Sequence, residues 1–291
     1  MEKLAIAGGR PVTESKPAPW PVIGDSEKEN LLQVLESGKW WYGEKVRRFE
    51  SEYASFQNAK YGVSCMNGSM ALEMGLLACG ISEGDEVIIP PYTFLATATA
   101  VIRVNAVPVF ADISLSTCNL DPADVERKIT PRTRAIMPVH FAGLPADMDA
   151  LKAVAAKHSL AIIEDACHSW GSQWKGKGTG AIGDCGVFSF QMSKNITAGE
   201  GGILLTDNEE IAEIARSYSN CGRLPNRHNY QHFLPGGNMR MTEMQAAMHI
   251  CNEACWIPQT ALLGDSKDMQ DIADAVEKVW EQRDALAAMG E

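Results

Sequence analysis

The segment Ala161-Ile162-Ile163-Glu164-Asp165-Ala166-Cys167-His168 decides the fold class. In it, an apolar run leads directly into two carboxylates, without the polar alternation of a half-exposed strand. Such a run is typical of a parallel strand that is buried on both faces. In open parallel sheets the binding site lies beyond the carboxyl ends of the strands. The polar residues that follow this run are therefore the first candidates for a site.

Similar apolar runs lie on both sides of this segment and alternate with helical patterns. The expected strands are 86–89, 107–110, 135–139, 161–163, 187–190 and 202–205. The expected helices are 69–79, 93–104, 147–158 and 209–219. This alternation predicts an α/β fold with three α/β/α layers, in which a mostly parallel sheet is covered by helices on both faces.

The composition excludes several classes of protein. Of the 291 residues, 45% are hydrophobic and 22% charged, which excludes a disordered or fibrous protein. Lys and Arg number 26 and Asp and Glu 37, and the net charge of −11 argues against nucleic acid as a partner. The first residues lack the apolar core of a signal peptide, and no apolar stretch approaches the ~20 residues of a membrane span. We expect a cytoplasmic protein with no membrane partner.

Eight cysteines are spread along the chain, too few and too scattered for a disulfide framework. We expect them to be reduced thiols. Cys251 and Cys255 with His249 resemble part of a metal site, but a fourth ligand at usable spacing is missing. We therefore expect no metal.

Polar and aromatic residues follow most of the expected strands. They are Pro90 to Phe94, Asp112, His140, Glu164 with Asp165 and the nearby His168, and Gln191 to Lys194. A set that includes an aromatic ring, acids, imidazoles and a lysine is more typical of a cofactor enzyme than of a binding scaffold.

Asp165 ends a run that the pattern places deep in the sheet. A buried carboxylate needs a partner. One possible partner is the protonated nitrogen of a pyridine ring, as in pyridoxal 5′-phosphate (PLP). Another is a neighbouring helix that the carboxylate caps. Glu164 is the weaker candidate, because alternation along the strand directs it to the opposite face.

Lys194 lies between a strand and the glycine-rich turn Gly199-Glu200-Gly201-Gly202. A partly desolvated lysine has a lowered pKa and can form a Schiff base near neutral pH. The alternative is a surface lysine on a loop, and position alone does not decide between the two. The glycine-rich turn lacks the Lys-Ser/Thr pair of a P-loop and opens a strand, which excludes an ATP or GTP site of that type.

Asn67-Gly68-Ser69 follows an apolar run and opens a helix. Free N–H groups at a helix N-terminus bind phosphate, and Gly68 permits a close approach. The alternative is a plain helix cap, since Asn and Ser are favoured there. Two more residues have similar double interpretations. Phe94 can stack on a flat cofactor ring or pack in the core, and His168 can bond a cofactor oxygen or be structural.

In this order, these residues resemble the DegT/StrS-type aminotransferases, PLP enzymes of the aspartate-aminotransferase fold (fold type I) that aminate keto-sugars and keto-cyclitols. The resemblance runs from about Leu4 to Ile250. Its motifs include Asn67-Gly68-Ser69-Met70-Ala71-Leu72, Pro91-Tyr92-Thr93-Phe94, Glu164-Asp165-Ala166-Cys167-His168, Phe188-Ser189-Phe190-Gln191 and Gly237-Asn238-Met239-Arg240-Met241-Thr242-Glu243.

The resemblance implies a role for each matching residue. Lys194 matches the Schiff-base lysine, and Asp165 matches the partner of the pyridine nitrogen. Phe94 matches the aromatic residue stacked on the ring, and His168 takes a cofactor-binding position beside it. Gly68, Ser69 and Ser189 match the phosphate binders. Asn238 matches the residue that reaches the phosphate of the neighbouring subunit's cofactor, which implies a homodimer with shared active sites.

The resemblance also implies an activity. It predicts transfer of an amino group from glutamate or glutamine to a keto-sugar or keto-cyclitol, in amino-sugar, aminocyclitol or related natural-product biosynthesis. Lys194 argues against the sugar dehydratases of the same fold, which carry His at this position. A non-catalytic or decayed relative that binds PLP, or only dimerises, stays open.

Three features are similar to one subgroup of the family. His168 stands where many sugar-nucleotide members have Gln, and the subgroup that acts on cyclitols or on amino-hydroxybenzoate precursors has His there. Gln191 and the pair Trp40-Trp41 favour the same subgroup.

The chain departs from the family pattern after Ile250. The following residues resemble the extreme C-terminus of the family, so the middle of the small C-terminal domain is expected to be missing. We therefore predict a PLP-binding large domain over 1–250, with the N-terminal arm, and a remnant of the small domain over 251–291. A helical pattern over 266–289 predicts a terminal helix.

Overall fold

The computed structural model describes residues 5, 8–10, 20–21, 23–224 and 231–248. The chain divides into two compact units, Gly24–Cys255 and a second one of Met1–Ile23 with Trp256–Glu291. The fold below is that of the first unit. The predicted terminal helix, the departure after Ile250 and the residues His249, Cys251 and Cys255 lie outside the described residues. The domain boundary at residue 250 therefore stays a prediction.

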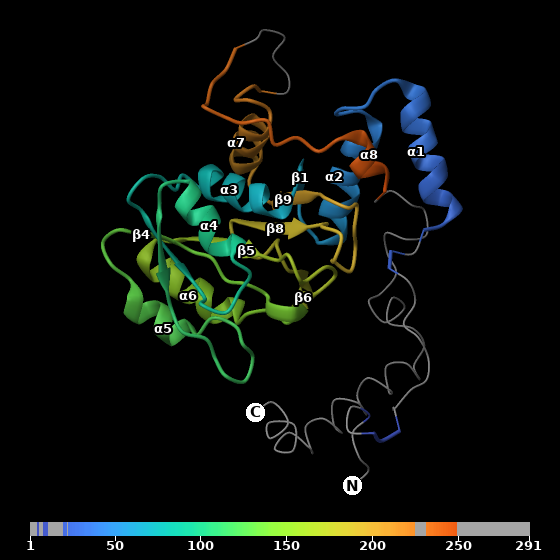
Figure 1. The fold of residues 1–291 in the computed structure, drawn as a ribbon. Helices are drawn as coiled ribbons and strands as arrows, with labels where there is room; N and C mark the ends of the chain where they lie inside the picture. Colours follow the sequence, from blue (N-terminus) through green and yellow to red (C-terminus); the bar gives the residue numbers. More distant parts are fainter. Residues whose placement is uncertain (1–4, 6–7, 11–19, 22, 225–230, 249–291) are drawn as a thin grey trace. The chain divides into compact units, whose positions relative to one another are not determined.

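A seven-stranded sheet forms the centre of the Gly24–Cys255 unit (Figure 1). Its strands are β1 (Tyr61–Cys65), β2 (Glu86–Ile89), β3 (Val107–Phe110), β4 (Thr133–Ile136), β5 (Ala161–Asp165), β8 (Cys185–Ser189) and β9 (Gly202–Thr206). Their spatial order is β1-β9-β8-β5-β4-β2-β3. Only β9 runs against its neighbours, so the prediction of a mostly parallel sheet is confirmed. A short hairpin, β6 (Gln173–Trp174) and β7 (Lys177–Gly178), forms a separate sheet.

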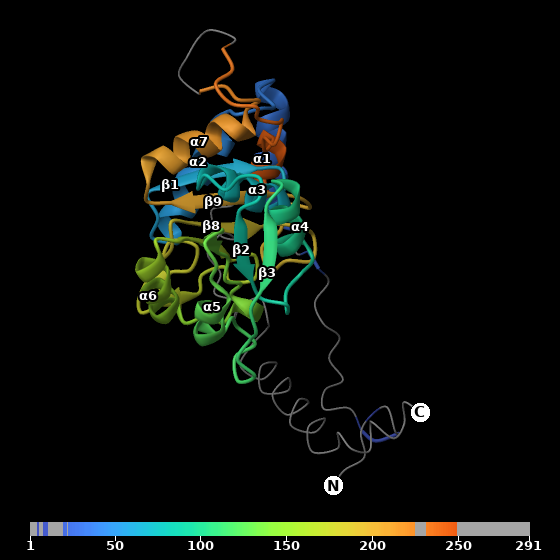
Figure 2. The same ribbon diagram turned by 90° about the vertical axis from the view of Figure 1, so that its left-hand side faces the viewer.

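Helices cover both faces of this sheet, which confirms the predicted three layers (Figures 1 and 2). On one face lie α3 (Gly68–Ala78), α4 (Ala96–Arg103) and α7 (Glu209–Ser219). On the other lie α2 (Glu44–Phe56), α5 (Pro122–Lys128) and α6 (Met148–His158). The helices α1 (Asp25–Ser37) and α8 (Glu243–Ala247) pack near α2.

Side-chain alternation along β5 decides what faces the site. Ile163 packs with the α3 side of the sheet, whereas Ile162 packs with the α5 and α6 side. Successive residues of a strand point to opposite faces, so Asp165 shares the face of Ile163 and Glu164 that of Ile162. The two adjacent carboxylates therefore belong to different layers.

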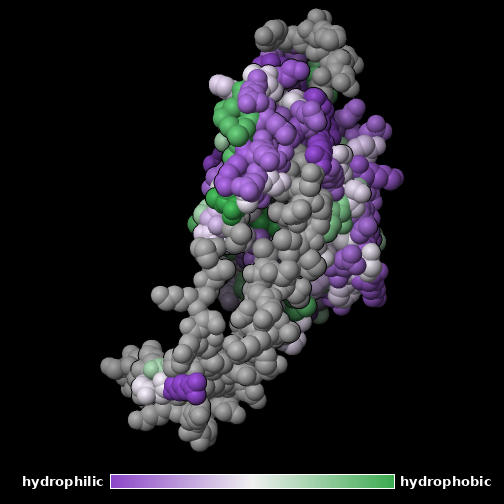
Figure 3. Space-filling model, turned by 90° about the vertical axis from the view of Figure 1, so that its right-hand side faces the viewer, coloured by the Kyte–Doolittle hydropathy of each residue, from purple (hydrophilic) through white to green (hydrophobic). Residues whose placement is uncertain are grey.

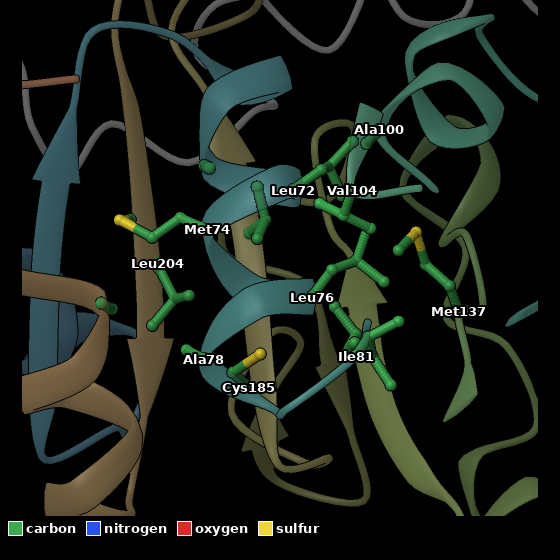
Figure 4. Packing of buried hydrophobic residues seen from close by; sticks show 14 of the residues in the cluster. Leu72, Met74, Leu76, Ala78, Ile81, Ala100, Val104, Met137, Cys185 and Leu204 are labelled. Atoms are coloured by element: carbon green, nitrogen blue, oxygen red, sulfur yellow. The ribbon is translucent and has the colours of Figure 1, made fainter. Parts of the chain in front are cut away.

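The helix α3 is the central helix of its layer. Its buried residues include Leu72, Met74 and Leu76, which are all at most 1% exposed. Figure 4 shows Leu76 and Ile81 near Met137 and shows Met74 near Leu204. This packing fixes the axis of α3, and with it the direction in which the helix N-terminus points.

The helix α1 is mostly exposed, and only Glu27 and Val34 are buried in it. The face of the molecule that carries α1 is largely hydrophilic, with small hydrophobic patches (Figure 3). None of the described helices combines the length and the apolarity needed to cross a lipid bilayer. The cysteines within the described residues are all free thiols.

Some predicted boundaries are wrong. The strand expected over 135–139 is β4, Thr133–Ile136, which ends two residues before Pro138, a residue without an N–H for the ladder. The helix expected from Thr93 begins at Ala96. The sequence analysis also missed β1, whose Gly62 and Ser64 weaken the strand pattern and whose pairing with β9 supplies its stability.

Candidate active site

A cavity of about 740 Å³ lies at the carboxyl ends of β5 and β8, beside the N-terminus of α3. This volume is within the usual range for small-molecule sites. Every residue predicted for the site lines this cavity except Asn238. Those present are Gly68, Ser69, Phe94, Asp165, His168, Ser189 and Lys194.

Asp165 is 5% exposed and faces the cavity from the end of β5. Its Oδ2 accepts a hydrogen bond of 2.8 Å from the Thr97 hydroxyl, and its Oδ1 accepts one of 3.3 Å from the Cys167 backbone N–H. Both donors are neutral. Among the described residues, no cation lies within ion-pair distance of this carboxylate. A buried carboxylate in such surroundings is suited to a cationic partner on the cavity side.

Lys194 enters the cavity from the loop after β8 and is half-buried. Its Nζ lies 5.9 Å from the centroid of the Trp170 ring, within cation–π range. The Trp170 indole in turn donates a 3.1 Å hydrogen bond to the backbone oxygen of Ser189. In the described part of the chain, no carboxylate lies within 4.0 Å of Nζ. The amine is therefore held by a ring and left without an ion-pair partner.

The N-terminus of α3 forms another wall of the cavity. The Asn67 side chain caps the helix by accepting from the Met70 N–H at 2.9 Å. Within the described residues, the N–H groups of Gly68 and Ser69 have no protein acceptor, and they stand where the helix dipole is positive. The capping and anion-binding interpretations of this motif are thus compatible, because they use different N–H groups.

Gly68 is required by close packing. A Cβ atom at this position would lie 2.6 Å from the Ser189 Cβ and 3.3 Å from the Cys167 Sγ. The absence of a side chain brings the first turn of α3 next to the end of β8. The Ser189 hydroxyl therefore lies beside the free N–H groups of α3.

Aromatic side chains line the cavity mouth. Phe94 is 71% exposed, in the loop between β2 and α4. The rings of Tyr92 and Phe141 are tilted by 37° with their centroids 4.4 Å apart, and Phe141 meets His168 edge-on at 6.2 Å. Exposed aromatic surface in this position is available to a flat ring.

His168 is half-buried, and its pKa is lowered from the ordinary value. Burial is the main cause, and the positive charge of Lys194 lowers the pKa further, whereas the negative charge of Asp165 raises it. Within the described residues, neither ring nitrogen has a hydrogen-bond partner in the protein. The His168 imidazole therefore lines the cavity in its neutral form at neutral pH.

This pKa yields a prediction about neighbouring charges. Replacing Lys194 by methionine is expected to raise the His168 pKa, and Asp165→Asn is expected to lower it, as measured by NMR titration of the imidazole. Because the folded pKa lies below the unfolded value of about 6.5, stability is complete above that pH and falls as the pH drops through it. The loss of stability at low pH should be smaller in His168→Asn, which has no imidazole to protonate. An unchanged titration in Lys194→Met would contradict the arrangement of these charges.

Glu164 lies on the opposite face of β5, as alternation predicts. Its carboxylate is fully buried and accepts from His140 Nε2 at 2.8 Å and from the N–H groups of Gly180, Ile182 and Gly183. The Ala146 N–H donates to His140 Nδ1, which places the imidazole proton on Nε2. His140 is therefore a structural residue outside the cavity. Asp112, at the end of β3, does not line the cavity either, because the site lies nearer the centre of the sheet.

Asn238 is exposed and lies outside the cavity. Its Oδ1 accepts from Arg240 Nε at 2.9 Å, and Arg240 stacks over Trp41 at 4.4 Å. The cavity of one chain therefore does not use Asn238.

The sequence analysis missed several residues of this site. Thr97 and Trp170 support Asp165 and Lys194, and Cys167 lies between Asp165 and Gly68. The four-residue spacing of Thr93 and Thr97 on a helical pattern was a usable signal for a hydroxyl pair. Trp170 carried no comparable signal. Among the described residues, no group of three or more His, Cys, Asp or Glu side chains could hold a metal ion.

The sequence model of the DegT/DnrJ/EryC1/StrS aminotransferases matches residues 21–253. The chain belongs to this family. The match includes every residue of the cavity and also Asn238, and it agrees with the resemblance inferred from the motifs. The members of the family named below share its fold at 34–42% identity.

Two relatives illustrate the similarity. The 3-amino-5-hydroxybenzoate synthase of Amycolatopsis mediterranei is 42% identical over 233 residues, which cover 79% of this chain and 60% of the relative. A Streptomyces kanamyceticus protein assigned as an L-glutamine:3-amino-2,3-dideoxy-scyllo-inosose aminotransferase is 41% identical over 254 residues, or 86% of this chain and 61% of the relative. The chain thus spans about 60% of the length of these relatives.

Solved structures agree with the fold. That of 3-amino-5-hydroxybenzoic acid synthase has a TM-score of 0.79 at 40% identity, covering 81% of this chain and 62% of the other. That of NtdA from Bacillus subtilis, with its cofactor PMP bound, has a TM-score of 0.74 at 34% identity, covering 81% of this chain and 55% of the other.

Proposed function

We propose that this protein is a PLP-dependent aminotransferase that moves an amino group from glutamate or glutamine to a keto-sugar or keto-cyclitol. One observation carries the proposal. The buried carboxylate of Asp165 and the amine of Lys194 face the same cavity, whose wall also presents the N–H groups at the start of α3. The combination matches the ring nitrogen, the aldehyde and the phosphate of PLP.

The residues present fit this cofactor. Gly68, Ser69 and Ser189 would hold the phosphate, since all three line the cavity at the N-terminus of α3. The absence of a Cβ on Gly68 lets the helix start lie next to Ser189. Asp165 would hold the ring nitrogen, because its protein donors are neutral. Phe94 and His168 would contact the ring and its oxygen from the cavity wall.

When bound, PLP supplies a ring that withdraws electrons from the carbon that loses its proton. Asp165 keeps a proton on the ring nitrogen, since an ionised carboxylate stabilises the cation beside it. The amine of Lys194 would hold the cofactor, and the same amine would serve as the general base that takes the proton from the donor's Cα. Trp170 keeps the lysine side chain oriented toward the cavity.

The substrate class in this proposal rests on relatives. The Streptomyces kanamyceticus relative is named for an amino-inosose and for glutamine, and the Amycolatopsis relative for an aminohydroxybenzoate. His168 faces the cavity, as the comparison with the cyclitol subgroup requires. Polar side chains of Gln191, Ser193 and Glu200 also line it, and they would suit a hydroxylated substrate.

We also propose that two copies of the chain form the active unit. Asn238 is exposed and outside its own cavity, beside Arg240. Tyr92, Phe94 and Leu95 are 50–71% exposed at the cavity mouth. Exposed apolar surface of this kind is suited to an interface.

The test is a half-reaction followed by absorbance. The purified chain is loaded with PLP and then mixed with glutamine or glutamate. We expect a visible absorbance band that disappears when the donor is added, as pyridoxamine phosphate and the corresponding keto acid form. Borohydride reduction before the donor is added, followed by peptide mapping, is expected to place the label on Lys194.

A second lysine beside a Trp ring is the control for the position of the label. Lys175 and Lys194 both lie near a Trp ring, but Lys175 is on the β6–β7 hairpin and pairs with Asp149. Label on Lys175 or at random lysines would refute the assignment of Lys194. If Lys194 carries the label but no amino donor removes the visible band, the protein would be a PLP-binding relative without transaminase activity.

A further inference from the structure

Thr97 is buried beneath the proposed cofactor site. It lies in the first turn of α4 and is 0% exposed, and it does not line the cavity. Its hydroxyl lies 2.8 Å from Asp165 Oδ2 and 2.7 Å from the hydroxyl of Thr93. Thr93, in contrast, does line the cavity and precedes Phe94. A short chain of hydroxyls therefore connects the aromatic loop with the buried carboxylate.

The direction of this chain follows from proton counting. An ionised carboxylate only accepts hydrogen bonds, so the single hydroxyl proton of Thr97 points at Asp165. The Thr97 oxygen can then only accept from Thr93, whose proton points at Thr97. The relay therefore runs from Thr93 through Thr97 to Asp165, and both protons stabilise negative charge on the carboxylate.

Thr97 makes the shorter of the two bonds to Asp165. The other donor, the Cys167 N–H, is at 3.3 Å and comes from the same strand end as Asp165 itself. Among the described residues, only Thr97 ties the carboxylate to a different element. It fixes Oδ2 from the α4 side, on a carboxylate that lines the cavity.

We propose that Thr97 is a positioning residue that orients Asp165 toward the ring nitrogen of the cofactor. The inference rests on the proposed function, since it assumes that Asp165 binds that nitrogen. Removing the hydroxyl should weaken the contribution of the ring nitrogen to binding and leave the contribution of the phosphate unchanged.

The test compares two ligands that differ at one atom. Pyridoxamine phosphate is used because it has no aldehyde to react with Lys194. Its partner is an analogue in which a C–H group replaces the ring nitrogen. Calorimetric titration of the full chain without cofactor gives both dissociation constants, and their ratio measures recognition of the nitrogen. The variants are Thr97→Val, Thr97→Ser, Asp165→Asn and Thr99→Val.

The wild type is expected to prefer the nitrogen-containing ligand. Thr97→Val should reduce this preference about tenfold, the usual size for loss of a hydrogen bond to a charged group. Thr97→Ser should keep the preference because it keeps the hydroxyl. Thr99→Val is the matched control, since Thr99 is on the same helix and, among the described residues, its hydroxyl bonds only to the Ala96 backbone.

Each other outcome has a distinct meaning. If Thr97→Val weakens both ligands equally, Thr97 is merely structural and the inference fails. If Asp165→Asn also leaves the preference unchanged, or the wild type has none, the proposed role of Asp165 fails instead. If Thr97→Val does not fold, Thr97→Ala removes the same hydroxyl without adding a methyl group, and the same ratio decides.

Discussion

Replacing Lys194 by alanine is expected to lower steady-state amino transfer by about 100- to 10,000-fold or more, the range typical for loss of a general acid–base group. The physical reason is that Lys194 supplies an amine to the cavity and, among the described residues, this amine has no ion-pair partner. Its loss would remove both the group that binds the cofactor covalently and the group that carries the proton. The measurement is formation of glutamate- or glutamine-derived keto acid with a keto-cyclitol or keto-sugar acceptor. Full activity in Lys194→Ala would refute the assignment.

Two controls sharpen this prediction. Small primary amines in the buffer should restore part of the rate of Lys194→Ala, because a free amine can carry the same proton. Mixing Lys194→Ala with Asn238→Ala chains should give about a quarter of the wild-type activity, because half of the random dimers contain one intact site out of two. No recovery on mixing would contradict shared active sites and leave the role of Lys194 standing.

Replacing Glu164 by alanine is expected to lower the free energy of unfolding by about 3–5 kcal/mol, as for removal of one partner from a buried charged network. Its carboxylate accepts four hydrogen bonds, from His140 and from Gly180, Ile182 and Gly183. Without it, buried N–H groups of the segment before β8 lose their acceptor. Urea unfolding of the chain without cofactor measures the change.

Glu126→Ala is the matched control for Glu164→Ala. The Glu126 side chain is exposed and pairs with Lys157 on the surface. Surface pairs contribute little, so this variant should unfold close to the wild type. If Glu164→Ala were as stable as Glu126→Ala, the buried hydrogen bonds around Glu164 would not determine stability.

The central strands and the residues at their ends could be predicted from the sequence. The run before Glu164 and Asp165 predicted β5, and alternation along it separated the two acids correctly. Lys194 and Gly68 were candidates because of their places after a strand and before a helix, and the family resemblance implied their roles; both line the cavity. His140 and Asp112 met the same criterion and are not in the site. A position after a strand does not distinguish the central strands from the edge, because strand order is a property of the folded sheet.

The sequence by itself determined the fold class, the family and seven residues of the cavity lining, among them Asp165 and Lys194, because buried strands and turn residues leave local patterns. Only the tertiary structure decided what surrounds them. It placed Thr97 against Asp165 from α4, Trp170 against Lys194, and Glu164 among the N–H groups before β8. These contacts join residues 16–68 positions apart in the chain. Their partners depend on how helices pack on the sheet, which no local periodicity encodes.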